Sequence, residues 1–162
     1  DGSMTPLYNI RDGWAAGARL NGDRDGNQGS PFGFESEMRQ ILAAIKAAGI
    51  KNVVFVATDV HHARLLRYEP SGDLAGIVFH EFIAGPASAV SSPPGLLSRA
   101  FNPIELFARG RGPDPERPSF VNFGLLRLGA DGVLTVEIRD AEGAIPQDDR
   151  GRVGALTLTP AR

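Results

Sequence analysis

The spacing of hydrophobic residues changes along the chain from a helical to a strand pattern. In residues 35–48, apolar side chains recur at intervals of three and four, which predicts a helix with a single buried face. The residues of that apolar stripe are Met38, Ile41, Leu42 and Ile45. Gly49 follows, as expected of the residue that ends a helix in a left-handed conformation.

The rest of the pattern predicts strands. Val53 to Ala57 is an unbroken, largely β-branched run, which indicates a strand covered on both faces. Further strands are expected at 63–68, 76–83, 120–128, 133–139 and 153–159. Residues 84–119 are expected to form a long loop, interrupted only by the apolar piece 104–107. One helix and about six strands predict an α/β fold that is α+β within this segment. Because one helix covers one face of a sheet, the other face is expected to be bare.

Residues 1–34 contain no segment with a helical or strand pattern. They predict either a flexible tail or an extended arm, with Trp14 as its anchor, that lies on an N-terminal half of a longer protein. We favour the arm, because a helix followed by a buried strand is half of a βαβ unit whose first strand would lie upstream. The folded part is then 35–162.

Composition excludes several classes of protein. The 162 residues include no cysteine, so disulfide scaffolds, cysteine-ligated zinc and thiol nucleophiles are excluded. The net charge of −2 predicts no nucleic-acid-binding surface. No apolar run approaches the roughly 20 residues that a transmembrane helix needs.

Candidate chemistry follows the first predicted strand. Asp59 and His61 lie two positions apart at its carboxyl end, where α/β sheets place their sites, and both side chains can reach one ion. A carboxylate with an imidazole suits Fe, Mn or Zn, and the carboxylate alone suits Ca²⁺. The alternative is a structural hydrogen-bonded pair at a strand end. His80 and Glu81, inside a predicted strand, are interpreted as a structural pair.

Two segments carry a resemblance to a known family. The segment 51–61 (KNVVFVATDVH), preceded by its helix, and the segment 82–89 (FIAGPASA) resemble the C-terminal part of the PhoD-like alkaline phosphatases, which also include secreted phospholipases D. In that family a strand of the type "NVV-L-GDVH" is followed by an "EF-GP" strand, a proline-rich stretch and a final hairpin. The order agrees over roughly residues 12 to 160, and Asp-Gly-Trp at 12–14 resembles the family's segment before the helix.

The resemblance implies a calcineurin-type metallophosphoesterase, a four-layer β-sandwich flanked by helices, of which 35–162 would be the C-terminal half. It implies that Asp59 and His61 ligate a metal cluster, Fe with Ca or else Mn or Zn, and that the remaining ligands lie in an N-terminal half. It also implies a secreted or periplasmic protein. The sequence departs from the family at Thr58, where glycine is usual, and at His62, where a small hydroxyl residue is usual. His62 is interpreted either as a residue that faces substrate or supports a ligand, or as a solvent-exposed or packing histidine.

Two functions are consistent with these observations. The first is the C-terminal portion of a metal-dependent phosphoesterase that hydrolyses phosphomonoesters or phosphodiesters, of the alkaline phosphatase D or phospholipase D type. The alternative is a non-catalytic, β-rich binding or accessory module in which Asp59 and His61 are structural. The periodicity of the chain allows both, and the family likeness favours the enzyme.

Overall fold

The structure, a computed structural model, describes residues 35–58, 60–94, 97, 101–114 and 117–161. Its helix α1 spans Glu35–Ala47, which confirms the predicted helix. Met38 and Leu42 of the apolar stripe are buried, whereas Ile41 is 45% exposed and lies at the margin of the buried face. None of the helices in the described part of the chain is long and apolar enough to cross a membrane.

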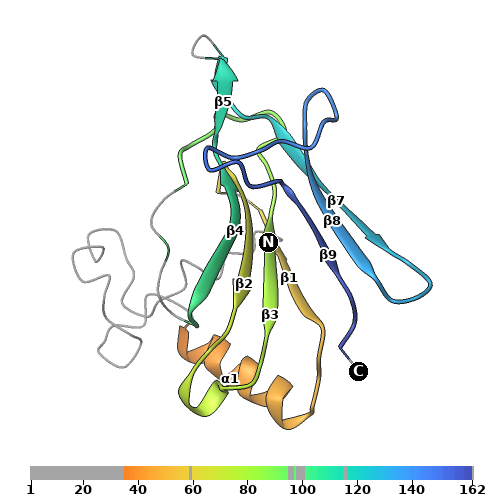
Figure 1. Ribbon diagram of the computed structural model, residues 1–162. Helices are drawn as coiled ribbons and strands as arrows, with labels where there is room; N and C mark the ends of the chain where they lie inside the picture. Colours follow the sequence, from red (N-terminus) through yellow and green to blue (C-terminus); the bar gives the residue numbers. More distant parts are fainter. Residues whose placement is uncertain (1–34, 59, 95–96, 98–100, 115–116, 162) are drawn as a thin grey trace.

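The central sheet has four strands in the order β1-β3-β2-β4 (Figure 1). Their bounds are β1 Val53–Ala57, β2 Ala63–Tyr68, β3 Phe79–Ile83 and β4 Pro103–Arg109. A short 3-10 helix, η4, covers Gly72–Leu74 between β2 and β3. β1 runs parallel to β3, whereas β2 is antiparallel to both of its neighbours. Among the described strands β1 pairs only with β3, so it forms an edge of this sheet.

The remaining strands form two smaller sheets. A three-stranded antiparallel sheet has the order β7-β8-β9, and β5 pairs with β6 in a two-stranded ribbon. Their bounds are β5 Arg111–Asp114, β6 Arg117–Ser119, β7 Asn122–Leu128, β8 Leu134–Asp140 and β9 Ala155–Leu158. The predicted hairpin is confirmed, with its turn at residues 129–132. The fold is α+β, as predicted.

Two hydrophobic cores lie on opposite faces of the central sheet. On one face, Met38 and Leu42 of α1 pack with Leu66, Tyr68 and Phe79. On the other face, side chains of the central sheet pack with the β7-β8-β9 sheet, through Leu65, Phe82, Phe107, Val136 and Ile138. The second face is therefore not bare, and that prediction is wrong. The hairpin forms a separate layer over this face instead of extending the central sheet (Figure 1).

The prediction of a long loop over 84–119 is also wrong in part. β4, β5 and β6 all fall within it, which raises the number of strands from about six to nine in the described part of the chain. The apolar piece 104–107 is the middle of β4, which pairs along the whole length of β2. The apolar stretch is shorter than β4, because Pro103 and Arg109 at its ends do not fit a strand pattern. Pairing with β2, and not the local sequence, keeps these end residues extended.

An ionic network connects the central sheet to the segment before β9. Asp148 accepts hydrogen bonds from the backbone of Ala108, Arg150 and Arg152 and from the Arg152 guanidinium at 2.7 Å. Arg152 also donates to Glu105 of β4, whose second carboxylate oxygen lies 3.0 Å from Arg64 Nε. These charges are paired over short distances and largely shielded from solvent, so they hold the two layers in one register.

Candidate metal-binding site

The carboxyl ends of β1 and β3 lie side by side at one end of the central sheet, because these strands are parallel. Residues 58–62 leave β1 there and lead into β2, and residues 84–89 leave β3 at the same end. β4 also ends there, because Arg109 pairs with Ala63 at the start of β2. The position that the sequence predicted for chemistry is therefore a meeting point of three segments.

His61 is exposed at this end of the sheet and has a left-handed backbone, with φ of 57°. Such a conformation is uncommon outside glycine and costs free energy, and it often marks a functional position. The His61 Nδ1 lies 2.7 Å from the carbonyl oxygen of Val90. Because a carbonyl only accepts, Nδ1 donates its proton in this contact, and in the neutral imidazole Nε2 is then the nitrogen with the lone pair. Metal-binding histidines in proteins are commonly oriented by this kind of contact.

Asp59, the other predicted ligand, lies outside the described residues. The two residues that follow it are held by Ser92. Val60 accepts a hydrogen bond from the Ser92 hydroxyl at 3.2 Å, and His61 accepts one from the Ser92 amide at 2.8 Å. The segment around Val90 and Ser92 is thus fastened to the loop that follows β1. The contact between His61 Nδ1 and the Val90 carbonyl is one of the hydrogen bonds that join these two segments.

Asn122 holds the second loop in place, and sequence reasoning missed it. This fully buried residue begins β7, and its amide exchanges two hydrogen bonds with the backbone of Gly85, at 2.9 and 2.8 Å. It donates another to the Phe120 carbonyl, and its backbone N–H donates to Pro86. In the sequence Asn122 is a single polar residue at the start of a strand, so no local signal distinguishes it.

A cavity of about 430 Å³ opens beside His61. It lies between the loop after β1, the loop after β3 and the start of β7. Its lining consists of Thr58, His61, Ala84, Gly85, Pro86, Ala87, Ser88, Ala89, Asn122, Phe123 and Gly124. The cavity therefore places an imidazole with an available nitrogen next to a space large enough for a small molecule.

His62 is buried, unlike its neighbour His61. Burial, reinforced by the positive charge of Arg64, lowers the pKa of His62 to about 4, so this imidazole is neutral at physiological pH. Its Cβ lies against Gly110, where an added methyl group would stand 3.0 Å away. This location agrees with a packing histidine and not with a solvent-exposed one, and it does not bring the side chain into the cavity lining.

His80 and Glu81 are adjacent in β3 and point to opposite faces of the sheet. Glu81 is fully buried and accepts a hydrogen bond of 2.7 Å from the Tyr68 hydroxyl. His80 is on the other face, where burial followed by the charge of Arg67 lowers its pKa. The two side chains therefore do not form a pair with each other, and that interpretation is wrong; Glu81 pairs with Tyr68 instead.

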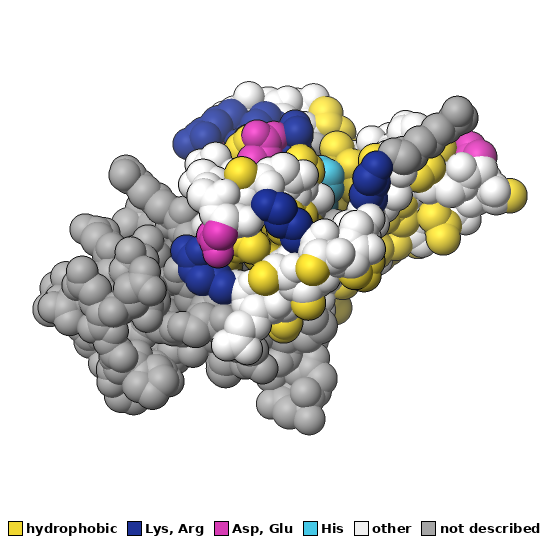
Figure 2. Space-filling view, turned by 90° about the horizontal axis from the view of Figure 1, so that it is seen from below, with side chains coloured by type: hydrophobic (Ala, Val, Ile, Leu, Met, Phe, Trp, Pro, Cys, Tyr) yellow, Lys and Arg dark blue, Asp and Glu magenta, His cyan; other side chains and the backbone are white. Residues whose placement is uncertain are grey.

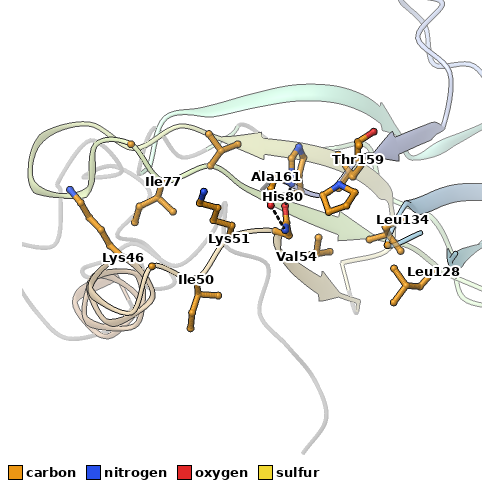
Figure 3. Close-up of a pocket in the computed structure, with 17 residues that line it drawn as sticks. Lys46, Ile50, Lys51, Val54, Ile77, His80, Leu128, Leu134, Thr159 and Ala161 are labelled. Atoms are coloured by element: carbon orange, nitrogen blue, oxygen red, sulfur yellow. Dashed lines mark hydrogen bonds between the residues drawn. The ribbon is translucent and has the colours of Figure 1, made fainter. Parts of the chain in front are cut away.

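A larger cavity of about 730 Å³ lies at the opposite end of β1 and β3. In Figure 3 Leu128 and Leu134 line one side, and Lys46, Ile50 and Ile77 line the other. The view of Figure 2 from the end where α1 lies shows hydrophobic side chains open to solvent, with lysine and arginine side chains among them. Since this cavity is lined from the amino ends of β1 and β3, it is separate from His61.

The described part of the chain brings together no group of three histidine, aspartate or glutamate side chains that could hold a metal ion. The comparison with protein families identifies the family. The sequence model of the PhoD-like phosphatase family matches residues 2–124. The chain belongs to this family. No curated protein and no solved structure gave a significant match. PhoD-like membership places the chain in a family of phosphatases and phosphoesterases, in agreement with the resemblance of segments 51–61 and 82–89.

Proposed function

We propose that this chain supplies Asp59 and His61 as ligands to the metal cluster of a phosphoesterase that hydrolyses phosphomonoesters or phosphodiesters. The contact between His61 Nδ1 and the Val90 carbonyl carries the proposal, because it leaves Nε2 as the nitrogen that can bind an ion. The residues fit such a group: an imidazole with its second nitrogen committed to a carbonyl is a suitable ligand for Fe, Mn or Zn.

Bound ions of this kind polarise phosphoryl oxygens and lower the pKa of a bound water. The chain's own residues act around them. His61 would bind an ion through Nε2, while the Val90 carbonyl accepts a hydrogen bond from Nδ1 and Asn122 fixes the loop that borders the cavity. We propose Fe with Ca, or else Mn or Zn, as the ions.

The proposal includes an N-terminal half of the same enzyme as partner. A hydrolytic metal site needs about three to six ligands, and this chain offers two candidates. The outer edge of β1 lacks a strand partner among the described residues, and Val56 on it is 44% exposed. An apolar edge strand of this kind is normally paired or covered in a native protein. Residues 1–34, proposed as an arm on that half, lie outside the described residues. We propose a secreted or periplasmic location.

The test uses Asp59→Asn and His61→Ala in the full-length protein, with metal content measured by mass spectrometry and turnover measured on a phosphomonoester and a phosphodiester. Loss of a residue that supports a metal ligand typically lowers metal affinity or activity about 10–100-fold. Loss of a ligand itself is therefore expected to lower turnover by at least about 100-fold and to reduce metal content in parallel. His80→Ala is the matched control, because it removes a half-buried imidazole from the opposite end of the sheet.

Full activity and full metal content in both ligand variants would refute the assignment. If the wild-type protein also held no metal and hydrolysed no ester, the alternative of a non-catalytic binding module would replace the enzyme.

A further inference from the structure

The cavity beside His61 has a lining of unusual composition for a site that handles phosphate esters. Among the described residues that border it there is no lysine, arginine, aspartate or glutamate. Its polar side chains other than His61 are the hydroxyls of Thr58 and Ser88 and the Asn122 amide, which is engaged with Gly85. The remaining lining is alanine, glycine, proline and Phe123. Such a lining favours apolar groups over charged ones.

Phe123 is the largest residue of this lining, and it is 48% exposed. It follows Asn122 directly, so its backbone position is fixed by the hydrogen bonds to Gly85 and Pro86. Gly124, next in β7, approaches the loop so closely that an added methyl group would stand 3.0 Å from Ala84 Cβ. The segment of β7 that carries Phe123 is therefore fastened to the loop on the other side of the cavity.

We infer that this cavity binds the uncharged organic group of a phosphate ester, with an aromatic or short alkyl group preferred over an anionic one; the inference rests on the function proposed above. Burial of apolar surface is favourable, and the exposed Phe123 ring offers a face for an aromatic group. An additional anionic group would lose water here without gaining a cationic partner from the described lining.

The test measures binding and not turnover, because turnover would also depend on the chemical reactivity of the leaving group. Isothermal titration calorimetry on the metal-loaded full-length protein gives dissociation constants for methylphosphonate, phenylphosphonate and 4-carboxyphenylphosphonate. Phenylphosphonate is expected to bind about 10-fold more tightly than methylphosphonate, because the ring buries apolar area. The added carboxylate is expected to remove about 10-fold of affinity.

Two variants make the inference specific to this cavity. Phe123→Ala is expected to bring the affinity ratio of phenylphosphonate to methylphosphonate close to one, with little change for methylphosphonate. Leu126→Ala, which truncates a similarly exposed residue of the same strand outside the lining, should leave the ratio unchanged. Ala87→Lys adds a cation to the exposed part of the lining and should make 4-carboxyphenylphosphonate the tighter ligand.

Equal affinity of the wild-type protein for phenyl- and methylphosphonate would overturn the inference, as would a ratio that survives Phe123→Ala. In either case, metal-dependent binding of methylphosphonate would leave the proposed function standing. If none of the three phosphonates bound to the metal-loaded protein, the inference and the proposed phosphoesterase site would both be refuted.

Discussion

Replacement of Asn122 by alanine is expected to destabilise the protein and to loosen the loop that borders the candidate site. The alanine variant loses three side-chain hydrogen bonds, two to Gly85 and one to the Phe120 carbonyl, all between 2.8 and 2.9 Å. It keeps the backbone hydrogen bond from residue 122 to Pro86, so the start of β7 keeps its place.

The magnitude follows from the burial of this residue, whose side chain is fully enclosed. Each lost hydrogen bond costs about 1 kcal/mol net, and more where its backbone partner is left without water. The sum is about 3–4 kcal/mol in the free energy of unfolding. For a domain of this size that corresponds to a fall in melting temperature of about 10 °C.

The assay is thermal unfolding of the full-length protein, with Leu126→Ala as the control in the same strand. Leu126 is 41% exposed, so its truncation should cost less than about 1 kcal/mol. Asn122→Asp separates hydrogen bonding from volume: at neutral pH it places a carboxylate oxygen against the carbonyls of Gly85 and Phe120. It should be at least as destabilising as the alanine variant. A melting temperature for Asn122→Ala equal to that of Leu126→Ala would refute the reasoning.

Two further predictions concern packing and pH. Gly110→Ala places a methyl group into the carbonyl oxygen of Ser92 and close to His62 Cβ, so it should lower the free energy of unfolding by about 1–3 kcal/mol; an unchanged urea midpoint would contradict this close approach. Burial alone would raise the pKa of Asp148, but backbone donors and Arg152 outweigh it and hold that pKa below the ordinary value of 3.8. Its stabilisation is therefore present above pH 3.8 and is lost as the pH falls through the lower folded-state value. Asp148→Asn should cost about 1.5–3 kcal/mol at pH 7, with a smaller difference from wild type in urea denaturation at pH 3; a constant difference would contradict it.

Local patterns predicted the elements whose side chains repeat with one period. The stripe that begins at Met38 predicted α1, and the β-branched run from Val53 predicted β1. The alternation in β8 predicted the hairpin. β4 was not predicted, because its residues mix proline, glutamate and arginine with apolar side chains. Pairing with β2 holds it extended. Whether a strand joins a sheet or stacks upon it is likewise not a local property. For this reason the β7-β8-β9 sheet was not predicted to cover the central sheet.

The candidate site divides in the same way. The sequence by itself determined that Asp59 and His61 follow a strand, although this strand lies at an edge and is not fully covered on both faces as expected, and that the chain carries the segments typical of PhoD-like phosphatases. Only the tertiary structure decided which nitrogen of His61 stays available, because Val90 lies 29 positions away along the chain. Only the tertiary structure brought Asn122 to Gly85, across 37 positions. The period of hydrophobic residues in a segment depends only on residues that are neighbours in the sequence. A hydrogen bond between distant loops forms only once the strands between them have paired and packed.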